Sequence, residues 1–208
     1  MTFMTYRELL SVLDAARRRR TRDWCMLLVA YRHGLRTTEV CGLKLKDVQN
    51  GRLSVQRRKG SRFTIQPLCP DPIEPLLDEV RALREWLSVR RDDGSKALFT
   101  SQKGGALDRS QFFRVFQSLA KAAGLPEGKR HPRLLKYSLA SHLLDRNAGL
   151  TFVSDILGHR AVHSTRLYAQ TISGAAANTV GVRTAWPVEA HGSPAPCTTA
   201  LALSAIHL

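Results

Sequence analysis

Hydrophobic positions recur at helical spacing along most of the chain and alternate with polar ones in one short stretch. Helical or nearly continuous apolar patterns predict helices over residues 5–18, 23–33, 37–41, 76–90, 108–123, 136–147, 152–157 and 164–170. Alternation predicts two strands over residues 52–56 and 62–68, and residues 97–99 fit a further short strand. The pattern therefore indicates an α+β fold that is mostly helical and carries a small antiparallel β-sheet.

Local signals place the ends of several elements. Thr5 and Glu8 have the spacing of a capping box, so a helix is expected to begin there. Gly34 is suited to end the apolar helix before it, and Asn50-Gly51 is a strong hairpin turn signal. Residues 57–61 (RRKGS) are expected to form a basic tip between the two strands.

The net charge of the chain indicates the kind of partner that it binds. Lys and Arg outnumber Asp and Glu by 32 to 17, a net charge of +15 that favours a polyanion such as nucleic acid. No apolar run reaches the roughly 18 residues of a membrane span, and the N-terminus lacks the pattern of a signal peptide. A cytoplasmic protein without a membrane partner is expected.

The composition changes near residue 174. From there Ala, Thr, Gly, Ser and Pro dominate, and the single Arg183 and Glu189 cancel, so the whole net charge belongs to residues 1–173. We expect one domain over residues 1–173 and a C-terminal tail over 174–208 that could dock on a neighbouring protomer. The four cysteines have no CxxC spacing, so neither a zinc ribbon nor a disulfide framework is indicated.

Separated basic and hydroxyl residues offer the groups that metal-free phosphodiester cleavage needs. That chemistry requires a nucleophile, fixed positive charge around the phosphate and an acid for the leaving oxygen. The candidates are Arg36, Lys59, Arg133, Lys136, His159 and Tyr168. Each alone has an ordinary structural explanation, such as a helix-end cation or a solvated turn residue. His159 and His163 lie four apart, but no zinc-site motif extends the pair, so no metal or other cofactor is expected.

Taken together, these residues resemble the conserved boxes of tyrosine recombinases, the phage integrase class. Residues 31–40 (YRHGLRTTEV) resemble the first box, in which Arg36 matches a catalytic arginine. The sequence Leu-Gly-His ending at His159, with Tyr168 nine residues later, resembles the box that ends in the nucleophile. Lys59, eight residues before a proline, is similar in position to the family's β-hairpin lysine.

The resemblance covers about residues 5–172 and is strongest to the compact recombinases that invert fimbrial promoter segments, through residues 82–90 and 101–112. One box departs from the family pattern. Where the family has His-x-x-Arg, this chain has Arg133 and Lys136, with His131 two residues earlier. An arginine fork can hold two phosphate oxygens whereas a lysine ammonium is a point charge, so the change at 136 puts full activity in question.

The resemblance implies that a homo-tetramer cuts and rejoins double-stranded DNA and that the reaction needs neither ATP nor a metal. Tyr168 would attack the scissile phosphate to form a 3′-phosphotyrosyl link, and Lys59 would protonate the leaving 5′-oxygen. Arg133 would serve as acid/base or clamp, and Glu39 would orient the cluster. The groups expected to surround the phosphate are Arg36, Lys136 and His159. Integration, excision and inversion are all open outcomes.

Two alternatives belong to other functional classes. The first is a catalytically impaired DNA-binding regulator on the same scaffold, which the Lys136 substitution favours. The second is a helical RNA-binding or ribosome-associated basic protein, which accounts for the charge but not for the spacing from His159 to Tyr168. Covalent capture of a nicked DNA substrate separates the enzyme from both.

Overall fold

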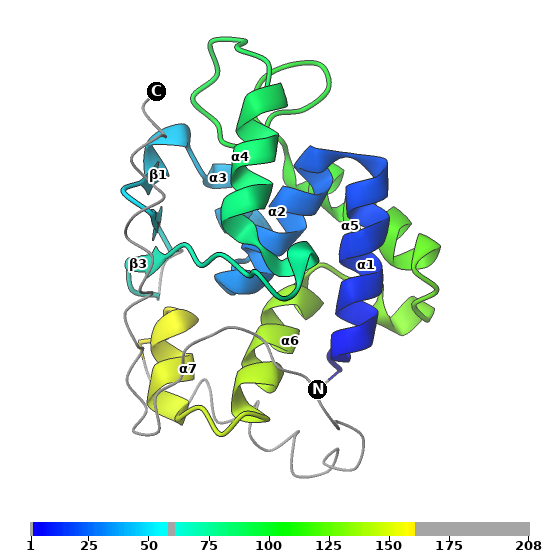
Figure 1. The fold of residues 1–208 in the computed structure, drawn as a ribbon, viewed down its shortest axis with the longest axis vertical. Coiled ribbons are helices and arrows are strands. Elements are labelled where there is room, and N and C mark those ends of the chain that lie inside the picture. Colours follow the sequence, from blue (N-terminus) through cyan, green and yellow to red (C-terminus); the bar gives the residue numbers. More distant parts are fainter. Residues whose placement is uncertain (1, 58–60, 161–208) are drawn as a thin grey trace.

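The structure, a computed structural model, describes residues 2–57 and 61–160. These form a mostly helical body with a small sheet on one side (Figure 1). The α-helices are α1 Tyr6–Arg19, α2 Thr21–Arg32, α3 Thr37–Gly42, α4 Glu79–Val89, α5 Arg109–Ala122, α6 Arg133–Leu144 and α7 Leu150–Ile156. Short 3₁₀ turns cover Leu45–Asp47, Pro75–Leu77 and Glu127–Lys129. The predicted helix over 164–170 and the tail lie outside the described residues.

Helix α2 forms the centre of the core. Its sequence is apolar on nearly every side, and all of its residues from Arg22 to Arg32 are buried. Such a helix is stable only when neighbours cover it all round. Helices α1, α4 and α6 pack against it, and Figure 1 shows it between them. The predicted buried helix is confirmed, and it gives the site a rigid support.

The N-terminal segment is tied to α6. The capping box predicted at the start of α1 is present, because Thr5 and Glu8 each accept from the other's backbone N–H. Just before it, the Met4 N–H donates to Ser138 Oγ at 2.8 Å, and the Met4 carbonyl lies 2.8 Å from His142 Nε2. Burial is the main cause that lowers the pKa of His142 to about 4, so this imidazole is neutral at physiological pH. These contacts hold the N-terminal segment against α6.

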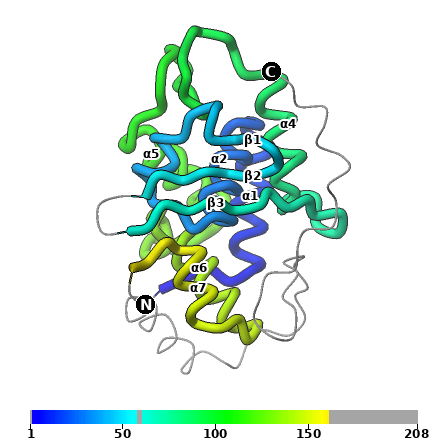
Figure 2. Tube along the Cα trace, turned by 90° about the vertical axis from the view of Figure 1, so that its left-hand side faces the viewer, coloured from blue at the N-terminus to red at the C-terminus, as the bar shows by residue number. Residues whose placement is uncertain are grey.

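The sheet has three antiparallel strands in the order β1-β2-β3 (Figure 2). Their bounds are β1 Val48–Gln49, β2 Arg52–Val55 and β3 Thr64–Pro67. Asn50 and Gly51, with φ of 51° and 67°, form the tight turn predicted between the first two strands. The connection from β2 to β3 includes residues 58–60, which lie outside the described part of the chain, so Lys59 has no described position.

Two local predictions need correction. Residues 97–99 do not form a strand of the sheet; Ala97 makes only an isolated bridge with Lys44. Their apolar character reflects packing, since the Leu98 carbonyl accepts from Trp86 Nε1 and Phe99 stacks on the Trp86 ring. Helix α6 begins at Arg133, three residues before the predicted start, which places two candidate residues on one helix.

The remaining expectations concern membrane spans, metal sites and cysteines. No helix in the described residues is long and apolar enough to cross a membrane. Within those same residues, no three His, Cys, Asp or Glu side chains gather as a metal site would require. His163, the second histidine of the pair considered for zinc, is outside them. Cys25, Cys41 and Cys69 are free thiols.

Candidate active site

A cleft of 380 Å³ brings together four of the six predicted site residues, Arg36, Arg133, Lys136 and His159. They come from three parts of the chain that only the fold joins: the start of α3, α6, and the segment that follows α7. Its other lining residues are Leu35, Thr37, Thr38, Arg109, His131 and Tyr137. Lys59 and Tyr168 lie outside the described residues. A larger hollow of 770 Å³ lies at the N-terminal end of α2 and contains none of the candidates.

Arg36 is placed by a close turn after α2. Gly34 has a φ of 57°, and a Cβ there would lie 2.7 Å from Leu157 Cδ2, so this glycine lets the turn approach the end of α7. Arg36 Nη1 donates to Glu39 Oε1 at 2.9 Å, and its backbone N–H donates to Glu39 Oε2 at 2.8 Å. The Arg36 side chain remains 40% exposed, which leaves its guanidinium accessible from the cleft.

Glu39 is the buried carboxylate beneath this arginine. Its burial would raise the pKa of the carboxyl group, but the Arg36 backbone N–H and the charges of Arg57, Lys136 and Arg36 hold that pKa below its usual value. The group is therefore an anion at neutral pH. Its contacts with Arg36 support the orienting role that the sequence suggested for it.

Lys136 lies on the floor of the cleft. Only 4% of the residue is exposed, and Nζ donates to the carbonyl of Leu157 at 3.0 Å. Burial, followed by the charges of Arg57 and Arg36, lowers the pKa of Lys136 to about 7, with Glu39 opposing the shift. Its amine thus changes charge within the physiological range, which an arginine in the same place would not do.

His159 follows α7 through a second left-handed glycine, Gly158, at a φ of 67°. It bridges to Ser61 on the returning arm of the hairpin, and the Arg62 N–H donates to the Gly158 carbonyl at 2.9 Å. Burial and the charges of Lys136, Arg36 and Arg57 lower the pKa of His159 to about 4. A neutral imidazole in this position can either donate or accept a proton in a hydrogen bond.

Two exposed arginines form the rim. Arg133 is the first residue of α6, and its backbone N–H lies 3.3 Å from His131 Nδ1. Burial and the Arg133 charge lower the pKa of His131. Arg109, the first residue of α5, lines the same cleft and was not among the predicted site residues. Its only sequence signal is its place after the N-cap Asp108.

Arg57 is not among the predicted site residues, because residues 57–61 are expected from the sequence to form a basic tip between the two strands. The structure buries it instead, with its side chain 0% exposed. The sequence contained a signal for this burial. Leu53, Val55 and Arg57 occupy every second position, a spacing that places side chains on the same face of an extended strand. Leu53 and Val55 face the core. The period of two therefore carries the arginine inward.

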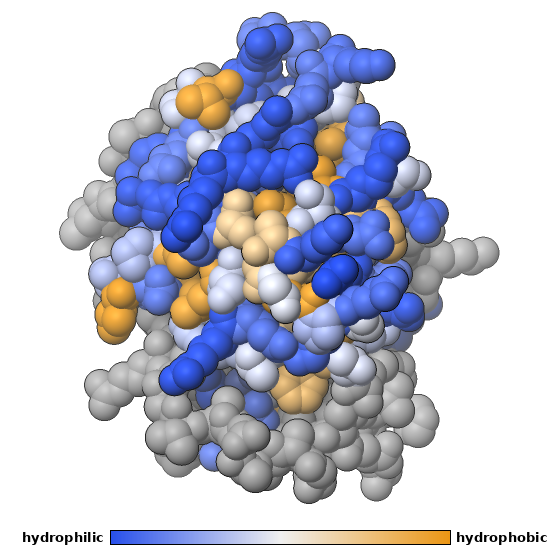
Figure 3. Space-filling view, turned by 90° about the vertical axis from the view of Figure 1, so that its right-hand side faces the viewer, coloured by the Kyte–Doolittle hydropathy of each residue, from blue (hydrophilic) through white to orange (hydrophobic). Residues whose placement is uncertain are grey.

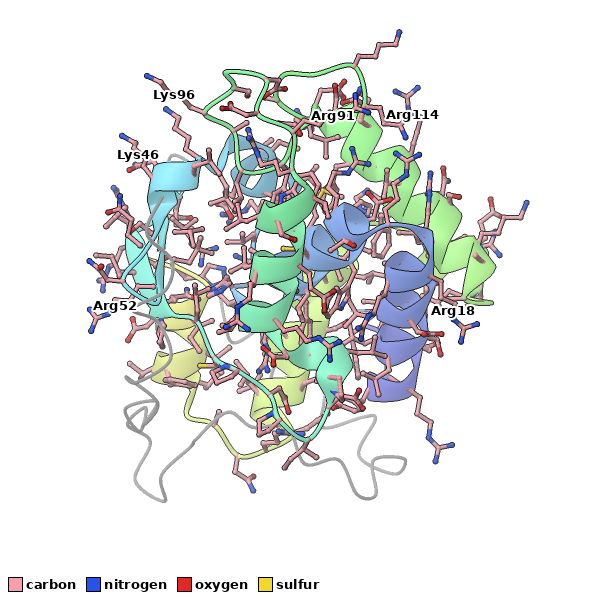
Figure 4. The ribbon with its side chains drawn as sticks, turned by 45° about the horizontal axis from the view of Figure 1, so that its top comes forward. Arg18, Lys46, Arg52, Arg91, Lys96 and Arg114 are labelled. Carbon is pink, nitrogen blue, oxygen red and sulfur yellow. The ribbon has the colours of Figure 1, made fainter. Side chains whose placement is uncertain are left out.

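Positive charge is not confined to the cleft. Figure 4 shows exposed cations pointing outward from several elements: Arg18, Lys46, Arg52, Arg91, Lys96 and Arg114. On the face formed by α1 and α5, hydrophilic side chains predominate and apolar ones form only small groups (Figure 3). The cleft differs from these surfaces because its exposed arginines lie above buried charged groups, Lys136 and Glu39, that are hydrogen-bonded to the protein.

Two kinds of relative match this chain. Residues 2–173 match the phage integrase family. The type 1 fimbriae regulatory protein FimE of Escherichia coli K12 is 33% identical over 161 residues, which are 74% of this chain and 76% of that protein. The tyrosine recombinase XerD of Mycobacterium tuberculosis is 32% identical over 173 residues, 79% of this chain and 55% of its own length.

Solved structures share the fold. The XerA recombinase superposes with a TM-score of 0.70 at 24% identity, covering 86% of this chain and 65% of that one. A lambda integrase tetramer bound to a Holliday junction gives a TM-score of 0.64 at 20% identity, covering 80% of this chain and 47% of that one. With the family match, the predicted fold is confirmed. This chain belongs to the phage integrase family of tyrosine recombinases.

Proposed function

We propose that this chain is a site-specific DNA recombinase that cuts and rejoins double-stranded DNA through a phosphotyrosyl intermediate. The observation that supports this most directly is the cleft itself, which collects Arg36, Arg133, Lys136 and His159 around one space of 380 Å³. Glu39, the buried carboxylate beneath Arg36, is paired with Arg36 and Arg57 and so does not repel an anion as an isolated acid would.

The exposed and buried residues divide the work. Arg36 and Arg133 present guanidinium groups to the non-bridging oxygens, and a planar fork can hold two of them at once. Lys136 contributes a single ammonium, already donating one hydrogen bond to Leu157. His159, neutral at physiological pH, donates to the phosphate or accepts the phenol proton. These fixed groups stabilise the charge of the transition state.

The remaining two roles fall on residues outside the described part of the chain. Tyr168 attacks the phosphate, which leaves a 3′-phosphotyrosyl bond and a free 5′-hydroxyl. Lys59 protonates that leaving 5′-oxygen. The covalent link preserves the phosphoester, so the reverse attack by a 5′-hydroxyl rejoins DNA without an external energy source.

We further propose that residues 1–173 form the catalytic domain and that the protein acts as a tetramer on two DNA sites. The lambda integrase tetramer on a Holliday junction shares this fold and supports that assembly. The tail over 174–208 is a candidate contact to a neighbouring protomer. A DNA substrate places the activity in the compartment that holds the DNA, which is the cytoplasm in a cell without a nucleus.

Covalent capture tests the proposal. Genomic fragments retained by the Tyr168→Phe variant would first supply a binding site, and a nick placed beside each candidate phosphate would then trap the cleaved product. The wild-type protein should form a DNA adduct that survives denaturation and disappears on protease digestion. Tight binding without an adduct at any nick position would favour the regulator alternative instead.

A further inference from the structure

Arg57 is a buried arginine that the proposed chemistry does not use. It follows β2 and lies under the cleft, where a charged group is costly unless every donor is paired. We propose that Arg57 is a positioning residue of the active site, whose guanidinium fixes the turn that carries Arg36 and the end of α7 relative to one another without contacting DNA. The proposal rests on the recombinase function above, because it concerns the geometry of that reaction.

The hydrogen bonds of Arg57 reach two sides of the site, the turn that carries Arg36 and the end of α7. Nη2 donates to the carbonyls of His33 at 2.8 Å and Ile156 at 2.7 Å. Nη1 donates to the carbonyl of Gly34 at 3.0 Å and to Glu39 Oε2 at 3.2 Å. One side chain thus joins the turn before Arg36, the carboxylate that holds Arg36, and the end of α7.

The same guanidinium has no donor left for a substrate. Nε donates to Thr64 Oγ1 at 3.1 Å, which completes the five N–H groups an arginine possesses. The side chain is 0% exposed and does not line the cleft. Burial lowers the pKa of Arg57 and Glu39 opposes that shift, but a guanidinium in a protein remains charged. Arg57 therefore acts through its neighbours.

The packing around Arg57 reaches the other half of the site. A Cβ added at Gly158 would lie 3.0 Å from Arg57 Cγ and 3.1 Å from Nε, so the backbone beside His159 rests directly on this side chain. One residue earlier, Leu157 supplies the carbonyl that holds Lys136. Displacing Arg57 would move the supports of Arg36, Lys136 and His159 together.

A matched comparison is available on the same scaffold. Arg32 is also buried, with its side chain 1% exposed, and it bonds to Asp71 at 3.1 Å and to the Leu77 carbonyl at 2.8 Å. Neither partner lines the cleft. If Arg57 matters only as a buried arginine, replacing either residue should have the same consequences for activity.

The experiment compares Arg57→Lys, Arg32→Lys and Thr64→Val in the full-length protein. Each is assayed for melting temperature, DNA affinity and single-turnover adduct formation on a saturating nicked site. Both lysine variants should lower the melting temperature on the order of 10 °C, as expected for a buried ion pair weakened in a protein of this size. Only Arg57→Lys should slow cleavage, by on the order of 100-fold, with affinity changed less than about threefold.

Thr64→Val keeps the charge and removes a single acceptor, so it remains folded even if Arg57→Lys does not. It should slow cleavage by about 3–10-fold, a loss on the scale of one hydrogen bond. Arg57→Met, studied below its melting transition so that the protein is folded, adds a second readout. Lys136 faces Arg57, Arg36, Glu39 and His159, and removing the Arg57 charge should raise the pH at which its amine titrates, measured by NMR without DNA.

The outcomes separate the two proposals. Adduct formation by the wild type with a normal rate in both Arg57→Lys and Thr64→Val would overturn the positioning role alone. An equal loss of cleavage in Arg57→Lys and Arg32→Lys would also overturn it, because stability would then explain both. Failure of the wild type to form any adduct would overturn the recombinase function and the positioning role with it.

Discussion

The floor and the rim of the cleft both carry net positive charge but differ in how that charge is held. The floor consists of Lys136 together with Glu39 and Arg57 directly beneath the cleft; all three are almost fully buried, and their hydrogen bonds join segments far apart in the sequence. On the rim, Arg133 and Arg109 are exposed at the first residues of two helices. Buried charges interact strongly and resist screening, whereas exposed ones are screened by salt.

This difference assigns separate tasks to the two regions. We propose that the floor fixes where the catalytic groups point, so changes there should affect the rate of cleavage and the stability of the fold. The proposed role of the rim is to attract and hold the phosphate backbone, so changes there should affect binding and leave the fold intact.

The largest effect is expected from the nucleophile that both regions serve. Tyr168→Phe removes the attacking oxygen and no charge, so adduct formation should fall below detection while DNA affinity changes less than about threefold. Denaturing gel analysis of a nicked substrate and a filter-binding titration measure the two quantities. An adduct that persists in this variant would move the nucleophile to another residue.

Salt should separate the rim from the floor. If the exposed cations neutralise six or more phosphates, affinity should fall about 1000-fold or more between 50 and 200 mM salt through counterion release. The cleavage rate of DNA already bound should change far less, because the floor charges are buried. A binding constant indifferent to salt would argue against nucleic acid as the partner of this +15 chain.

Much of the scaffold could be predicted because it depends on local patterns. Helical periodicity, the capping box at Thr5 and the turn at Asn50 each involve residues close in sequence, and each is confirmed within the part of the chain that the structure describes. The resemblance likewise placed Arg36 and His159 in one site, and the structure brings them to one cleft.

What could not be predicted depends on contacts between distant segments. The alternation of Leu53, Val55 and Arg57 indicated only that the Arg57 side chain points inward, because no local rule says that three carbonyls and a carboxylate from elsewhere will surround it. Arg109 joins the cleft only because α5 packs against α3. Residues 97–99 resembled a strand because burial and β-pairing favour the same apolar residues.

The next largest effect is expected at position 136, where this chain has a lysine in place of the family's arginine. Lys136→Arg should raise the cleavage rate by about 10–100-fold, since a guanidinium can keep a bond to the Leu157 carbonyl and still offer donors to two phosphate oxygens. Single-turnover adduct formation on a nicked site measures the change, with Tyr168→Phe in the same background as the blank. A slower Lys136→Arg protein would show that the floor, with Arg57 beside it, has adapted to the smaller ammonium.

The smallest expected effect is a pH dependence that originates in the floor. With its pKa lowered to about 7, Lys136 loses its proton as the pH rises, so its contact with the phosphate should weaken by up to tenfold per pH unit above that value. The pKa of His159 is lowered to about 4, so this side chain stays neutral between pH 6 and 9 and adds no pH dependence of its own there. The rate of adduct formation at subsaturating DNA reports the ionisation of the DNA-free protein. Corrected for the ionisation of the phenol, this rate should therefore decline on the alkaline side, and Lys136→Arg should abolish the decline. Arg133→His is the rim control, because a histidine there should introduce a dependence near pH 6.5 without altering the alkaline limb. An alkaline decline that survives in Lys136→Arg would assign the titrating group to another residue and remove the floor as its origin.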